Sequence, residues 1–105
     1  MKIVMRFLLC LFAVAMVFST RSFADDGADT FKSKCATCHG ADGKGSTAMG
    51  KALKLRDLSS ADVQKQSDAD MVNIVTNGKD KMPKYDGKLT KEQINDVVKY
   101  VRTLK

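Results

Sequence analysis

The chain of 105 residues is poor in histidine, cysteine, proline and aromatic side chains: it has one histidine, three cysteines, one proline and no tryptophan. Structural zinc takes four ligands, usually from two clusters of cysteine or histidine, and only one such cluster is present. The chain has no cluster of arginines and few aromatic residues, so we expect no binding to nucleic acid. No segment alternates apolar and polar residues as a half-buried strand does. These scarcities indicate one small domain without strands.

Residues 1–24 differ in composition from the rest of the chain. Two basic residues precede an uncharged, apolar run at residues 7–18, and the segment ends on small residues. This order is typical of a secretory signal peptide, here cleaved before Asp25. The apolar run would span roughly 18 Å as a helix, too little for a hydrocarbon core of about 30 Å. We therefore expect a mature domain at residues 25–105, exported to the periplasm and without stable membrane insertion.

The expected mature domain has 15 basic and 12 acidic residues, which gives a net charge of +3. A monomeric domain of this size buries only about 60–65% of its unfolded surface, so its core alone gives marginal stability. Domains of this size usually need a disulfide, a metal or a bound cofactor. The leader would remove Cys10, so Cys35 and Cys38 are the residues left to supply one. We expect the domain to be a monomer.

Periodicity and capping residues predict an all-α domain with four helical segments, at residues 26–35, 59–66, 67–78 and 90–105. Thr90 and Gln93 have the spacing of a capping box, and Gly78 is a stop signal at the end of the third segment. Residues 40–54 contain four glycines and are predicted to form a loop, with room for a helical turn near Lys51. The segment 79–88 is predicted to be a polar connection.

Residues 35–39 have the sequence CATCH, which allows a disulfide, part of a zinc site, or haem attachment. A disulfide between Cys35 and Cys38 would close a very short loop and restrict the unfolded chain little. A redox-active pair is typical of an α/β fold, for which this chain lacks strands. Zinc lacks further ligands, because no cysteine or histidine follows His39. Both of these interpretations remain possible, but each is weaker than haem attachment.

The spacing C-x-x-C-H is the attachment signature of c-type haem. Residues three apart near the end of a helix face the same side, so two thiols can reach the two vinyl groups at one edge of a porphyrin. The following histidine then lies beneath the iron. We predict one haem c, covalently attached through thioethers of Cys35 and Cys38, with His39 as one axial ligand of the iron. Such bonds would hold a cofactor that this small chain cannot enclose.

Methionine is the remaining candidate for the opposite face of the iron, because the chain has no second histidine. Met49 follows the motif too closely, and Met71 shares a helix face with apolar residues, where packing explains it better. Met82 lies in an irregular polar segment, and Pro83 favours an extended conformation there. Its position, 43 residues after His39, leaves enough chain to pass around the haem. We predict Met82 as the second axial ligand, the alternative being a loop methionine that fills a gap.

With these residues the mature chain resembles a small bacterial class I c-type cytochrome, with one haem and histidine–methionine ligation. The resemblance extends from about Gly27 to the C-terminus and rests on the stretches CATCHG, NGKDKMP and INDVVKYVRTL. It implies a cytochrome c fold, in which about four short helices surround one covalently attached haem and the terminal helices cross. It also implies that Gly27 and Phe31 on the first helix contact Val97 and Tyr100 on the last.

The chain departs from this family in one respect. Many members have a proline soon after the attachment motif, whose carbonyl oxygen accepts a hydrogen bond from the iron-bound histidine. No proline lies between His39 and Met82. The partner of the His39 imidazole is therefore open, and so is a role of Arg56 toward the haem propionates.

Histidine and thioether together fill both axial positions and leave none for a substrate. We therefore expect a soluble one-electron carrier, not an enzyme, that shuttles electrons between respiratory or photosynthetic partners. A peroxidase-like haem enzyme would need an open position and a distal acid–base residue. A gas-sensing module in which a ligand displaces Met82 is the third possibility.

Four lysines lie near Met82 in the sequence: Lys79, Lys81, Lys84 and Lys88. They indicate redox partner proteins with acidic docking surfaces, because complementary charge accelerates encounter. The simpler alternative is a loop kept polar for solubility.

Overall fold

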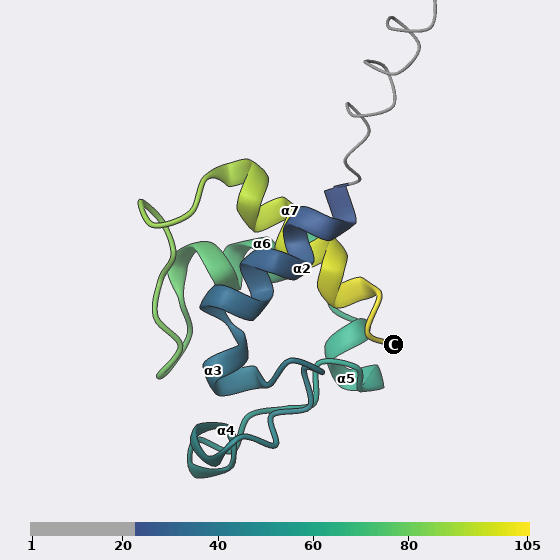
Figure 1. Cartoon of the computed structure of the whole chain (residues 1–105), viewed down its shortest axis with the longest axis vertical. Coiled ribbons are helices and arrows are strands. Elements are labelled where there is room, and N and C mark those ends of the chain that lie inside the picture. The colour runs from purple at the N-terminus through teal and green to yellow at the C-terminus, as the bar shows by residue number, and fades with distance from the viewer. Residues whose placement is uncertain (1–22) are drawn as a thin grey trace, which may run out of the picture.

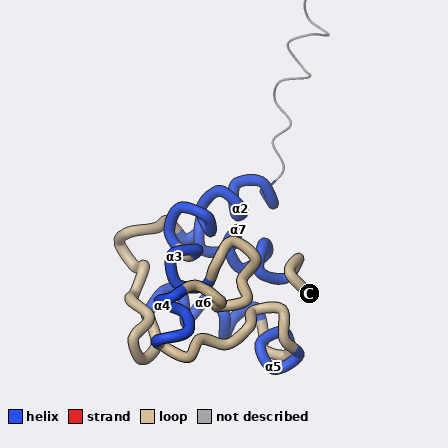
Figure 2. Tube along the Cα trace, turned by 60° about the horizontal axis from the view of Figure 1, so that its bottom comes forward, coloured by secondary structure: helices blue, strands red, loops and turns tan. Residues whose placement is uncertain are grey.

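The protein, a computed structural model, is described over residues 23–105, and this part contains six helices. They are α2 (Phe23–Lys34), α3 (Ala36–His39), α4 (Ala48–Ala52), α5 (Ala61–Gln64), α6 (Asp68–Asn77) and α7 (Lys91–Arg102). Over the same residues β structure is limited to two isolated bridges, and Figure 2 shows helices joined by loops. The prediction of an all-α fold is confirmed. The expected signal peptide lies outside the described residues except for its last two, which begin α2.

Helices α2 and α7 cross at close range, with α6 behind them (Figure 1). At the crossing, a Cβ atom on Gly27 would collide with the backbone carbonyl of Asp96, so glycine permits this approach. Phe31 and Val97 are 1% and 2% exposed and fill the centre of the contact. The rings of Phe31 and Tyr100 lie 5.2 Å apart between centroids, in a tilted arrangement. This crossing of terminal helices is the one that the resemblance implies.

Local sequence explains where α6 and α7 begin. Thr90 caps α7: its side chain accepts a hydrogen bond from the Gln93 amide, and the Gln93 side chain accepts one from the Thr90 amide. Ser67 caps α6 by accepting from the amide of Asp70. The buried face of α7 carries four residues at helical spacing, Ile94, Val97, Val98 and Val101. Both helices thus begin as predicted, and α7 buries the apolar stripe expected of it, whereas on α6 only Met71 is fully buried.

The middle of the chain is more divided than the sequence predicted. The attachment motif forms its own short helix α3, separated from α2 at Cys35, where the first helix was expected to end. The expected helical turn near Lys51 is α4, whose N-terminal residue is capped by Thr47. Helix α5 covers only four residues, and Ser60 caps it. These short helices line the lower part of the domain in Figure 1.

Arg102 joins the end of α7 to the connection between α5 and α6. Its guanidinium donates to the carbonyl oxygen of Gln64 at 2.6 Å and also to that of Gln66. It donates as well to the carboxylate of Asp68 at 2.8 Å. A planar guanidinium with five donors suits such a cluster of acceptors. Within residues 23–105, no helix combines the length and the apolar character that a membrane crossing needs.

Candidate haem site

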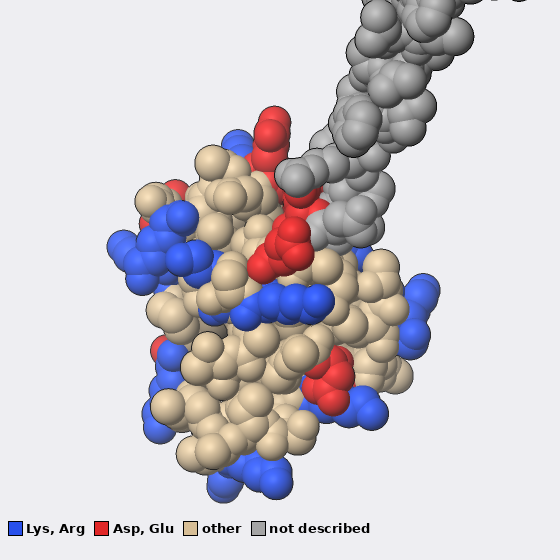
Figure 3. All heavy atoms as spheres, in the orientation of Figure 1, with Lys and Arg blue, Asp and Glu red and all other residues tan. Residues whose placement is uncertain are grey.

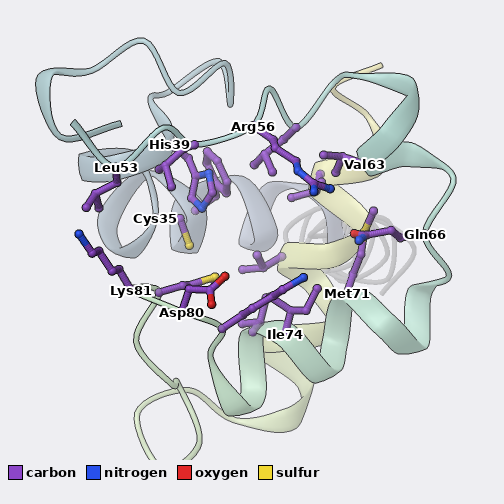
Figure 4. Close-up of a pocket in the computed structure, with 18 of the residues that line it drawn as sticks. Cys35, His39, Leu53, Arg56, Val63, Gln66, Met71, Ile74, Asp80 and Lys81 are labelled. Atoms are coloured by element: carbon purple, nitrogen blue, oxygen red, sulfur yellow. The ribbon is translucent and has the colours of Figure 1, made fainter. Parts of the chain in front are cut away.

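A cavity of about 570 Å³ lies between the crossing of α2 and α7 and the two long loops, at residues 40–58 and 79–89. This volume is within the range of cofactor sites, about 300–1,000 Å³. Its apolar wall is formed by the inner faces of α2, α6 and α7, with Phe31, Val97 and Val98 among the residues. Figure 4 shows His39 and Leu53 on one wall and Asp80 and Lys81 facing them. The cavity therefore lies directly on the hydrophobic core.

The helix break at Cys35 directs the attachment motif toward this cavity. Cys35 is 9% exposed, and its sulfur points into the cavity in Figure 4. Burial and the neighbouring Cys38 raise the pKa of the Cys35 thiol to about 11. Redox-active cysteines have a lowered pKa, which keeps the thiolate populated. This environment therefore argues against the interpretation as a redox-active pair.

His39 ends α3 and lines the cavity beside Phe31, with 6.4 Å between the ring centroids. Burial lowers the pKa of His39 from its ordinary value of 6.5, so the imidazole is neutral at pH 7 and has a lone pair available for a metal. Its Nδ1 atom is buried and has no hydrogen-bond partner among the described residues. In many family members a proline carbonyl oxygen accepts a hydrogen bond from this histidine. Within residues 23–105 no other group takes over that role.

The backbone around the attachment motif is held by the loop that follows it. The hydroxyl of Thr47 donates to the carbonyl oxygen of Cys38 at 2.7 Å and accepts from the amide of Gly50 at 2.9 Å. A Cβ atom on Gly50 would collide with the carbonyl oxygens of Cys38 and Gly45, so the loop packs directly on the motif. The amide of Gly45 also donates to the carbonyl oxygen of His39 at 2.7 Å. The glycines of this loop therefore fix the orientation of α3.

Met82 lies on a tight turn across the cavity. The amide of Met82 donates to the carbonyl oxygen of Lys79 at 2.9 Å, and the amide of Lys79 donates to the carbonyl oxygen of Met82 at 3.2 Å. Residues 79–82 therefore form a closed turn. Asp80 occupies the left-handed region within it, at φ 53°. Met82 is half-buried and lines the same cavity as Cys35 and His39. Three of the four predicted site residues therefore meet at one cavity.

Cys38 does not line the cavity: it is half-buried on α3, between the two residues that do. Met71 is 6% exposed and belongs to the core cluster, as packing predicted. Met49 is half exposed, on α4, and takes no part in the cavity. Of the three methionines in the described part, Met82 and Met71 thus reach the cavity, and Met82 does so from a loop.

Several cavity residues, such as Leu53 and Leu55, were not singled out in the sequence. Ile74 and Val75 are the apolar residues that share a helix face with Met71. This face was expected to pack in the core, but Ile74 and Val75 are only half-buried because it lines the cavity. Gln66 and Arg56 also line it, and Figure 4 shows both on the side away from Lys81. Arg56 had been noted as a candidate partner of the haem propionates, whereas Gln66 had no signal in the sequence.

The residues present fit a haem on three observations of this structure. The cavity has the volume and the apolar wall of a cofactor site. The imidazole at its edge is neutral and has no protein partner at Nδ1. A thioether borders the cavity from a separate loop. An all-α fold with crossed terminal helices, a C-x-x-C-H turn and such a cavity defines the class of small haem-carrying electron-transfer domains.

Comparison with known proteins agrees with this class. The family model for cytochrome C oxidase, cbb3-type, subunit III matches residues 22–101. Cytochrome c6 of Nostoc sp. (strain PCC 7120) is 40% identical over 101 residues, which cover 90% of this chain and 88% of that protein. Cytochrome c6 of Porphyra purpurea is 35% identical over 105 residues, 96% of this chain and 93% of that protein. Among solved structures, the KustC0563 c-type cytochrome has a TM-score of 0.71 and 34% identity, covering 76% of this chain and 98% of that one.

The chain therefore belongs to the c-type cytochrome family, as a small class I member. It carries one covalently attached haem c and serves as a one-electron carrier between redox partners.

Proposed function

We propose that Cys35 and Cys38 form the thioether bonds to the haem, and that His39 and Met82 are the axial ligands of its iron. The observation that supports this most is the meeting of Cys35, His39 and Met82 at one apolar cavity. The haem supplies a one-electron couple of its iron, whose potential a soft sulfur ligand and burial raise. The chain excludes water from one side through Phe31 and its neighbours on α7, and it fills both axial positions.

Replacement of each methionine by leucine tests the axial ligand, because leucine conserves volume and removes the sulfur. In the ferric holoprotein, Met82→Leu should abolish the weak charge-transfer band of an iron–thioether bond. Met71→Leu and Met49→Leu are the matched controls, and both should keep that band. A band that survives in Met82→Leu contradicts the assignment, and a band lost in Met71→Leu transfers it to α6.

We propose further that this carrier has no catalytic turnover of its own. Both axial positions would be filled, and the chain has no second histidine to serve as a distal acid or base. The wild-type holoprotein should then turn over hydrogen peroxide no faster than a haem peptide whose iron has an open axial position. Met82→Leu opens one position and should raise that turnover. Rapid turnover by the wild type would instead favour a haem enzyme.

The lysines near Met82 are proposed to guide the protein onto acidic redox partners. Lys79 and Lys81 line the cavity and are exposed, and Lys84 and Lys88 are exposed as well. Figure 3 shows basic groups gathered at the left of the molecule, where Figure 1 places the loop that carries Met82. Acidic groups in this view lie mainly over α2, although a few also lie at the lower right and at the left edge. Residues 79–88 contain four lysines and two aspartates, and this excess of positive charge orients an encounter before contact is made.

Charge reversal at one of these lysines tests the docking proposal. Lys81→Glu should slow electron transfer to the physiological oxidant at low salt, and the difference should shrink as salt screens it. Lys105→Glu makes the same change of charge at the C-terminus, which Figure 1 places on the other side of the domain, and it should have a smaller effect. Equal rates for all three proteins at low salt would contradict the proposal.

The remaining proposals concern the mature protein. We propose that it is a periplasmic monomer of residues 25–105, released by cleavage of a signal peptide at residues 1–24. The composition of the leader supports this, because a short apolar run follows two basic residues. The intact mass of the protein recovered from the periplasm should correspond to a chain that begins at Asp25. Recovery of the full chain in the membrane fraction would contradict cleavage.

A further inference from the structure

Tyr85 connects the loop of Met82 to the attachment motif. Its hydroxyl donates to the backbone carbonyl oxygen of Lys34 at 3.0 Å, across 51 residues of sequence. Lys34 is the last residue of α2, and Cys35 follows it directly. The bond thus joins the two segments that, in the proposed ligation, hold the haem from opposite sides.

The carbonyl of Lys34 is available because the helix breaks there. The last carbonyl groups of a helix lack partners within it and need others. In a continuous helix the Cys38 amide would donate to Lys34, but here it donates to Cys35 at 3.3 Å. The same break directs the Cys35 sulfur into the cavity (Figure 4). The Tyr85 hydroxyl therefore satisfies an acceptor that the haem-attachment geometry itself leaves open.

The rest of Tyr85 is fixed from α6. Its amide donates to the carbonyl oxygen of Val75, and that of Asp86 donates to Thr76, both at 3.1 Å. The ring is half-buried, and the ammonium of Lys88 lies 5.9 Å from its centroid. Burial raises the pKa of Tyr85, so its hydroxyl is protonated and able to donate at neutral pH.

We call residues 79–86 the methionine strap. Its own turn at residues 79–82 is closed by two backbone hydrogen bonds, and its far end is tied to α6. In the part of the chain that the structure describes, the Tyr85 bond is the one hydrogen bond between this strap and the α2–α3 region. We call residues 35–39, which carry the attachment motif, the attachment turn. Displacement of Met82 requires the strap to move away from this turn, and the Tyr85 bond opposes that movement.

We propose that Tyr85 is a positioning residue that holds the methionine strap against the attachment turn and so sets how readily Met82 leaves the iron. It acts through the strap and makes no contact with iron. This inference rests on the proposed ligation by Met82. The role belongs to the hydroxyl, because a phenylalanine ring would keep the packing and lose only the donor.

Imidazole binding to the ferric holoprotein tests the proposal, since imidazole competes with Met82 for the iron. Tyr85→Phe should bind imidazole about two- to tenfold more tightly than wild type, the range given by one hydrogen bond of ordinary net strength. Tyr100→Phe is the matched control, because the Tyr100 hydroxyl makes no hydrogen bond among the described residues and its ring packs at the helix crossing. It should bind imidazole as the wild type does.

Two further measurements separate the possible outcomes. The global free energy of unfolding is measured for all three proteins. A lower unfolding free energy in Tyr85→Phe with unchanged imidazole affinity shows a merely structural role and overturns the proposal. The charge-transfer band of the ferric wild type reports methionine ligation independently. If the band is absent from the wild type, the proposed ligand pair and this inference are both overturned. If the band is present but all three proteins bind imidazole with equal affinity, only the role of Tyr85 is overturned.

Discussion

The helix crossing and the two loops that border the cavity are built differently. At the crossing of α2 and α7, side chains fill each other's space, and Phe31 and Val97 are almost wholly buried. In the loops at residues 40–58, which include the short helix α4, and at residues 79–89, backbone hydrogen bonds and short turns hold the chain. Both non-glycine residues with positive φ in the described part, Lys54 at 57° and Asp80 at 53°, lie in these loops.

This contrast indicates which part of the domain needs its cofactor. The crossing supplies its own apolar partners from both helices. The loops face a cavity of about 570 Å³, and half-buried loop residues such as Leu53 and Leu55 line it. Because a domain of this size has a marginal core, contacts with the haem complete the packing of the loops. We therefore expect stability to differ between the two regions.

Loss of the covalent attachment of the haem should produce the largest difference in stability between the helix crossing and the loops. In a Cys35→Ala, Cys38→Ala double variant, amides of residues 40–58 and 79–89 should exchange hydrogen nearly as fast as in an unstructured peptide. Amides of α2 and α7 should keep more protection, because they are packed without the cofactor. Thr37→Ala, an exposed change between the two cysteines, is the control and should exchange like wild type. Equal loss of protection in both regions would show that the crossing has no stability of its own.

Truncation at the centre of the crossing gives the next largest effect. Phe31→Ala removes an almost fully buried ring and should lower the free energy of unfolding by about 3–5 kcal/mol. Chemical denaturation of the holoprotein measures this. Leu53→Ala, at the half-buried wall of the cavity, should cost less. If the two truncations cost the same, the core is not concentrated at the crossing.

The close approach of the helix backbones predicts a somewhat smaller loss. Gly27→Ala adds a methyl group against the carbonyl of Asp96, and overpacking of this kind typically costs about 1–3 kcal/mol. Gly87→Ala is a comparison in open space, although its φ of 82° adds backbone strain there. The two variants can be told apart by amide exchange: only Gly27→Ala should loosen α2 and α7.

The smallest effect should appear in the loops. Lys54 follows the C-terminus of α4 in the left-handed region, a position where glycine is preferred. Lys54→Gly should raise the free energy of unfolding by up to about 1 kcal/mol. The same substitution at Lys51, within α4, should lower it by about 1 kcal/mol. Thermal unfolding of both variants checks the opposite signs, and a loss in both would mean that Lys54 is not strained.

Local features of this structure were predictable from the sequence. Ser67 and Thr90 begin the helices that they were expected to cap, because capping depends on neighbours three residues away. Periodicity and capping residues predicted the all-α fold, and the resemblance implied the close approach at Gly27. The comparisons confirm the family and its covalent haem, but the assignment of each ligand remains a prediction.

Long-range features could not be predicted from the sequence. The separation of α3 from α2 has no capping signal, because the side chain of Cys35 accepts no capping hydrogen bond. The contact of Tyr85 with Lys34 joins residues 51 positions apart, and no periodic pattern encodes such a pair. The apolar face of α6 at Ile74 was taken for buried core, since periodicity does not distinguish a core from the wall of a cavity.

Intact-mass measurement of the mature protein, denatured in acid and organic solvent, tests the central claim that the haem is bonded to this chain. The account predicts that the red colour stays with the polypeptide and that its mass exceeds that of residues 25–105 by one haem. Colour that passes into the organic phase, with a polypeptide of unmodified mass left behind, would contradict the account.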